Sequence, residues 1–84
     1  MGDLKNAQSY YERAIEINPK FTHPISNLGN IKKELNNFEE AIKYYKLALS
    51  IDDKLYIVHH NLGMAYQAIG KFEESKKHFE SALK

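Results

Sequence analysis

The chain has 84 residues, a formal net charge of +1 at pH 7 and no cysteine. This length allows one small domain, and a composition of 43% hydrophobic and 27% charged residues is ordinary for a globular fold. The near-neutral charge disfavours nucleic acid as a partner, no apolar run approaches the roughly 18 residues of a membrane span, and the lack of cysteine excludes disulfides and fits an intracellular protein of the cytoplasm or nucleus.

The first predicted element is a helix over residues 3–17. Asp3 stands where an acidic side chain can cap a helix start, and Pro19 stops the helix because proline lacks the backbone N–H that a helix interior needs. A second helix is predicted over residues 23–35, since Pro24 falls in its first turn, where proline is tolerated.

The third predicted helix, over residues 37–51, has the clearest periodicity. Its apolar side chains recur at i, i+3, i+4, i+7, i+10 and i+11, which places them in one stripe: Phe38, Ala41, Ile42, Tyr45, Ala48 and Leu49. Asn37 and Glu40 have the spacing of a capping box, so we expect side-chain capping of the first turn.

Two more helices are predicted over residues 55–69 and 71–84. Gly70 separates them, and Asn36 stands at the matching place between the second and third helices. Both residue types suit the left-handed conformation that ends a helix. The sequence therefore predicts an all-α fold of five antiparallel helices.

The chain repeats itself with a period of 34 residues. Residues 27–41 read NLGNIKKELNNFEEA and residues 61–75 read NLGMAYQAIGKFEES, so the skeleton N-L-G…F-E-E occurs twice. A truncated third copy precedes them. A fixed period of this size indicates a helical repeat protein. We expect residues 1–84 to form a single domain of three units: a half repeat (2–21) and two repeats (22–55 and 56–84).

The repeat resembles the tetratricopeptide (TPR) pattern W-x2-L-G-x2-Y…A-x3-F…P. The first whole repeat has, at these places, Ile25, Leu28, Gly29, Lys32, Ala41, Tyr45 and Asp53. The second repeat has His59, Leu62, Gly63, Tyr66, Ser75 and Phe79, and the half repeat has Ala7, Tyr11 and Pro19. The missing aromatic, tyrosine and proline residues weaken local packing but leave the period intact. The resemblance implies a helix-turn-helix solenoid fragment.

In TPR proteins the first helix of each pair lines a concave groove, and Gly29 and Gly63 would let the paired helices approach closely. On a helical wheel, the faces opposite the packed residues carry the expected groove residues: His23, Ser26, Asn27, Asn30, Lys33, Ile57, His60, Asn61, Met64 and Gln67. Asn27 and Asn61 are identical, and an amide offers a peptide backbone both a donor and an acceptor. A structural role for these amides is equally open.

This resemblance implies a protein–protein interaction scaffold, not an enzyme, with a peptide or an extended protein segment as ligand. The chain is also similar to the asparagine-lined TPR arm of O-linked N-acetylglucosamine transferases, which holds protein substrates for a separate catalytic domain. A structural spacer in a larger solenoid is a further alternative. A clamp for acidic C-termini is disfavoured, because Ile57 and Asn61 stand where that clamp has basic groups.

We expect no catalytic residues, no cofactor and no metal site. Acidic pairs recur with the repeat in the first turns of two helices, where they favour the helix dipole: Glu39-Glu40 and Glu73-Glu74. A catalytic pair needs two distinct environments instead. His59 and His60 point about 100° apart on a helix and cannot share a metal ion, and His23 and His78 add no ligand spacing.

The first and last predicted helices are each the second helix of a pair. Apolar side chains at these two ends are therefore expected to be only partly covered: Leu4, Tyr11 and Ile15 at one end, and Phe72, Phe79 and Leu83 at the other. Repeat arrays need capped ends to stay soluble. We expect self-association through these uncapped ends.

Overall fold

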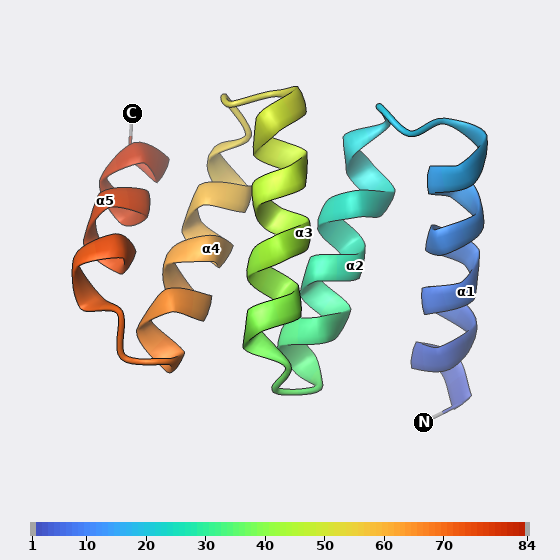
Figure 1. Ribbon diagram of the computed structural model, residues 1–84, viewed down its shortest axis with the longest axis horizontal. Coiled ribbons are helices and arrows are strands. Elements are labelled where there is room, and N and C mark those ends of the chain that lie inside the picture. The colour runs from blue at the N-terminus through green and yellow to red at the C-terminus, as the bar shows by residue number, and fades with distance from the viewer. Residues whose placement is uncertain (1, 84) are drawn as a thin grey trace.

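The computed structural model describes residues 2–83, which form five helices. They are α1 (Gly2–Ile17), α2 (Thr22–Glu34), α3 (Phe38–Ile51), α4 (Tyr56–Ala68) and α5 (Phe72–Ala82). The helices stand in one row and alternate in direction, with α1 and α5 at opposite ends (Figure 1). The predicted all-α fold is confirmed, and helix ends lie within two residues of their expected positions. The predicted end of the last helix, residue 84, lies outside the described residues.

Two of the turns between helices depend on left-handed residues. Asn36 has a φ of 62° and Gly70 a φ of 83°. In both turns the next N–H donates to the carbonyl five residues earlier, as in a Schellman motif. These bonds run from Asn37 to Lys32 at 2.8 Å and from Lys71 to Tyr66 at 2.9 Å. Asn36 and Gly70 therefore adopt the left-handed conformation that was predicted for them.

The capping box predicted at the start of α3 is wrong. The Asn37 side chain makes no capping hydrogen bond there. The Glu40 carboxylate instead lies 3.3 Å from the Lys32 ammonium on α2, so the acid is used between helices and not to close its own first turn. The hydrogen bond and charge of Lys32 hold the pKa of Glu40 below its usual range.

The core lies at the centre of the row, where α3 packs against both α2 and α4. The predicted α3 stripe supplies Ala41, Tyr45 and Ala48, all fully buried, and Ile25 and Leu62 cover it from the neighbouring helices. Each large aliphatic side chain buried in this way contributes about 1.5–3 kcal/mol. Helices α2 and α4 also touch, so the first helices of the two repeats share one face of the molecule.

Two glycines allow the paired helices to approach closely. A Cβ atom on Gly29 would lie 2.6 Å from a ring carbon of Tyr45, and one on Gly63 would lie 2.8 Å from the Phe79 ring. Since real Cβ contacts are longer than this, the aromatic ring of the second helix occupies the space that a side chain would need. The pairs α2–α3 and α4–α5 are therefore packed as the glycine spacing indicates.

Candidate functional site

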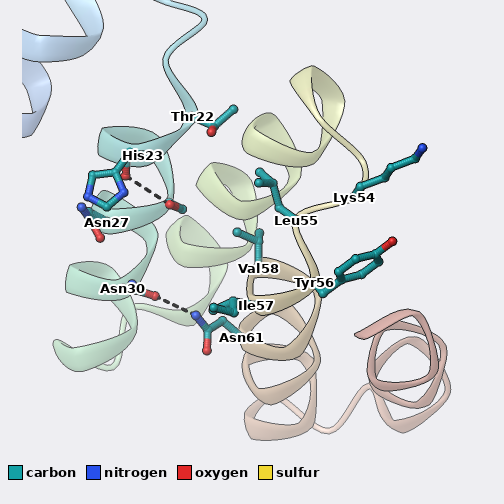
Figure 2. A pocket seen from close by; sticks show the side chains of 11 residues that line it. Thr22, His23, Asn27, Asn30, Lys54, Leu55, Tyr56, Ile57, Val58 and Asn61 are labelled. Carbon is teal, nitrogen blue, oxygen red and sulfur yellow. Dashed lines mark hydrogen bonds between the residues drawn. The ribbon is translucent and has the colours of Figure 1, made fainter. Parts of the chain in front are cut away.

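A cavity of about 450 Å³ lies between α2 and α4. Three segments form it: the exposed side of α2, the turn that follows α3, and the first turns of α4 (Figure 2). Figure 2 shows the Asn30 and Asn61 side chains pointing toward one another, with a dashed line for their hydrogen bond, while Leu55 and Val58 come from the turn before α4 and from its start. We call this cavity the α2–α4 groove. It lies between the first helices of the two repeats.

Six of the ten expected groove residues line the α2–α4 groove: His23, Ser26, Asn27, Asn30, Ile57 and Asn61. The other four do not line it. Lys33 lies just beyond, bonded to Asn61, and His60 lines a second cavity, of about 420 Å³, between α4 and α5. Met64 and Gln67 are exposed further along α4. On α4 this cavity takes in only the start of the expected strip, and the ten residues remain a prediction for a ligand-binding surface.

Five lining residues were missed by the sequence analysis: Thr22, Lys54, Leu55, Tyr56 and Val58. Thr22 begins α2, Lys54 and Leu55 lie in the turn before α4, and Tyr56 and Val58 lie in the first turn of α4. The helical wheel says nothing about a residue in a turn, and within the predicted helix 55–69 it selected only the face opposite the packed residues. The apolar residues Leu55 and Val58 at the start of α4 were the feature of the sequence that could have identified part of this lining.

A chain of hydrogen bonds connects α2, α3 and α4 at the floor of the groove. The Oδ1 atom of Asn30 accepts from the buried Tyr45 hydroxyl and from Nδ2 of Asn61, the latter at 3.2 Å. Oδ1 of Asn61 accepts from Nζ of Lys33 at 3.4 Å. Asn27 lines the groove but takes no part in this network. Asn27 and Asn61 thus differ: the Asn61 side chain joins α4 to α2 through hydrogen bonds, and Asn27 takes no part in them.

The Tyr45 hydroxyl is a fixed donor in this network. Burial raises the pKa of Tyr45 far above its ordinary value, because the phenolate would lose its hydration. The phenol therefore stays protonated and needs an acceptor, which Asn30 supplies. The arrangement ties the groove floor directly to the core.

The groove combines an apolar wall with polar donors. Leu55, Ile57 and Val58 form the wall, and Lys54 and His23 bring basic groups to the lining. None of the described residues that line the groove carries a carboxylate. The site therefore offers hydrogen-bond donors and positive charge beside an aliphatic surface.

The described part of the chain was searched for clusters of metal-ligating side chains and for membrane-spanning helices. No group of three or more metal-ligating side chains comes together among residues 2–83. None of the five helices is both long and apolar enough to cross a membrane.

Comparisons with known proteins agree with this fold. The second TPR of Spaghetti (RPAP3), solved bound to the HSP90 peptide SRMEEVD, matches with a TM-score of 0.93 and 26% identity, over 98% of this chain and 76% of that chain. A crystal structure of MamA matches with a TM-score of 0.91 and 26% identity, over 96% of this chain and 47% of that chain. A MamA mutant matches with a TM-score of 0.88 and 30% identity, over 96% and 44%.

This chain spans less than half the length of those MamA structures. No curated protein sequence matches it. One tetratricopeptide-repeat family model matches residues 22–84 and a second matches residues 1–21. With the 34-residue period, the helix pairs and these matches in agreement, the chain belongs to the tetratricopeptide-repeat family.

Proposed function

We propose that the chain is a protein-interaction scaffold that binds an extended peptide segment in the α2–α4 groove. The observation that carries this proposal is the cavity of about 450 Å³ with an aliphatic wall, several side-chain donors and no carboxylate among its described lining residues. An extended peptide presents aliphatic side chains together with a row of backbone carbonyl acceptors. It therefore complements both parts of this surface.

The charges around the groove favour a peptide that also carries carboxylates. Lys54 lies in the lining and Lys33 lies beside Asn61, so acidic side chains would find cations at both ends of the floor. The Spaghetti TPR, which is 26% identical, was solved with the acidic peptide SRMEEVD. That structure supports the class of ligand by analogy only, and the residues of this groove support it by chemistry.

Selection from a heptapeptide library displayed on phage, with this protein as bait, tests the proposal. We expect enriched sequences that combine an aliphatic residue with Asp or Glu. Synthetic SRMEEVD and its amide analogue SRMQQVN, which lacks the three side-chain carboxylates, serve as defined probes in the same titration. Electrostatic complementarity predicts weaker binding of the amide analogue and a loss of affinity for SRMEEVD at high salt.

Variants locate the binding surface. Replacing Asn27 by Ala removes an amide that the bridge between helices does not use, so binding of a selected peptide should weaken by about 3–10-fold, the value of one lost hydrogen bond. Ile57→Ser should also weaken binding, because Ile57 is 77% exposed and its loss costs little stability. Asn6→Ala, at an exposed amide of α1, is the matched control.

Two outcomes would contradict the proposal. Selected peptides that bind the Asn27→Ala and Ile57→Ser variants as tightly as the parent would place the site elsewhere. A library that yields no binder at all would favour the structural spacer.

A further inference from the structure

Two histidines that lie 19 residues apart in the sequence meet between α4 and α5. Nδ1 of His59 lies 3.1 Å from Nδ1 of His78, and the two rings stack with their centroids 5.3 Å apart. Nε2 of His59 lies 3.0 Å from the backbone oxygen of Asp53. Both histidine side chains are half-buried. Sequence spacing could not predict this contact, because it depends on how α4 and α5 cross.

These distances determine where the protons lie. A backbone carbonyl only accepts, so Nε2 of His59 donates to Asp53, and in the neutral ring Nδ1 is then an acceptor. Nδ1 of His78 must therefore be the donor in the contact between the rings. If both rings were protonated, two N–H groups and two positive charges would face each other across 3.1 Å. The contact between the rings therefore opposes the simultaneous protonation of both.

The surroundings of His78 also oppose a positive charge. Its ring stacks on Tyr66, with centroids 5.6 Å apart, and the Lys46 ammonium lies 5.9 Å from the centre of the same Tyr66 ring. The titratable and charged groups that face His78 are His59 and Tyr66 on α4, Lys46 on α3, and Glu74 and Lys77 on α5 itself. Glu74 alone among them carries a negative charge at neutral pH and favours the protonated ring. Burial, and then the charge of His59, lowers the pKa of His78 below its ordinary value of 6.5.

We propose that the His59–His78 pair is a proton-sensitive latch, which holds α5 against α4 at neutral pH and loosens it as the solution becomes acidic. Proton linkage gives the direction in which stability changes with pH. The unfolded chain, in which His78 has its ordinary pKa of 6.5, takes up a proton before the folded chain does. The stability of the α4–α5 contact is therefore complete above that pH and falls as the pH drops toward the lower folded value.

The latch has a structural consequence. Phe79 of α5 and His60 of α4 line the second cavity together, so a loosened α5 removes one wall of that cavity. The described lining of the α2–α4 groove contains no residue of α5. Acid should therefore change the α5 end of the molecule while leaving the α2–α4 groove in place.

Chemical denaturation at pH 7.5 and pH 5.5 measures the linkage. A linked proton changes the folding equilibrium constant by at most about tenfold per pH unit. We expect the constant of the parent to fall by about 3–10-fold more over this interval than that of a variant carrying both His59→Phe and His78→Phe, which keeps the stacked rings but cannot take up protons. His60→Gln, which changes the adjacent exposed histidine, is the matched control and should behave as the parent.

Hydrogen exchange and NMR locate the effect in the parent chain itself. Protection factors of α5 amides should fall with pH before those of α2. The imidazole C–H signals of His78 should titrate below pH 6.5. The proposal is overturned if the double variant keeps the pH dependence of the parent, if His60→Gln abolishes it, or if His78 titrates at or above its ordinary pH. The titration needs no variant, so it decides the question even where the double variant does not fold.

Discussion

At the scale of single residues, the two repeats use different side chains at matching positions between the paired helices. Tyr45 packs against Gly29 and donates to Asn30. The residues 34 positions later are Phe79 and Met64, so the hydroxyl and its acceptor are both replaced by apolar groups. A buried hydroxyl without an acceptor is costly, which explains why the two positions differ together. The hydrogen bond between Tyr45 and Asn30 is therefore specific to the first whole repeat.

The hydrogen bond between Tyr45 and Asn30 predicts that the effects of substituting the two residues on stability are coupled. Asn30→Met alone leaves the buried Tyr45 hydroxyl unpaired and should cost about 1–3 kcal/mol of unfolding free energy. Tyr45→Phe alone loses one hydrogen bond and should cost about 0.5–1.5 kcal/mol. The double variant copies positions 64 and 79 and should be more stable than the sum of the single losses indicates. Urea denaturation measures all three, and strictly additive losses would show that the hydroxyl and the amide are not coupled.

The hydrogen-bond network at the floor of the groove shows which properties of Asn27 and Asn61 the sequence could predict and which it could not. Their identity and period placed both on the exposed side of a first helix, and both line the α2–α4 groove. The bond from Asn61 to Asn30 was not predictable, because it joins two helices whose distance depends on the packed core. Substitutions of Asn61 are consequently poor tests of ligand binding, since they also remove a bridge between α2 and α4.

At the scale of helices, the prediction succeeded where the determinant is local. The α3 stripe, the proline positions and the left-handed residues Asn36 and Gly70 each act within a few residues, and the helix ends follow from them. It failed where the partner lies on another helix. Glu40 pairs with Lys32 instead of closing a capping box, and His78 meets His59. Helical periodicity specifies a direction for each side chain but no partner across an interface.

The close approach of paired helices gives a prediction for α4 and α5. Gly63→Leu must displace the Phe79 ring, whose nearest carbon would lie 2.8 Å from the new Cβ, so we expect a loss of about 1–3 kcal/mol through overpacking. Ala68→Leu, at an exposed position of the same helix, is the control and should change little. Thermal and urea denaturation measure both. A Gly63→Leu variant as stable as the parent would mean that α4 and α5 do not depend on this contact.

At the scale of the whole molecule, the helices in the middle of the row are better covered than the two helices at its ends. The middle helices have neighbours on both sides, whereas α1 and α5 each pack on one neighbour only (Figure 1). The expected partial exposure of the end residues is present. Leu4, Tyr11, Ile15 and Phe79 are half-buried, and Phe72 is 66% and Leu83 87% exposed. Apolar area thus accumulates along the two outer helices.

Self-association is the prediction that follows from these outer helices. Each large apolar side chain left in water forgoes about 1.5–3 kcal/mol of burial, and a contact between copies through α1 or α5 would recover part of it. We expect sedimentation velocity to show a larger species as the concentration rises from micromolar to millimolar, with Tm rising in parallel because association stabilises the folded chain. Phe72→Gln with Leu83→Gln should shift the equilibrium toward the monomer. Leu47→Gln, at a 46% exposed position of the central helix α3, should not. A monomer at every concentration with a constant Tm would show that these exposed side chains are tolerated singly, as many surface leucines and phenylalanines are, and that no interface forms between copies at the ends of the row.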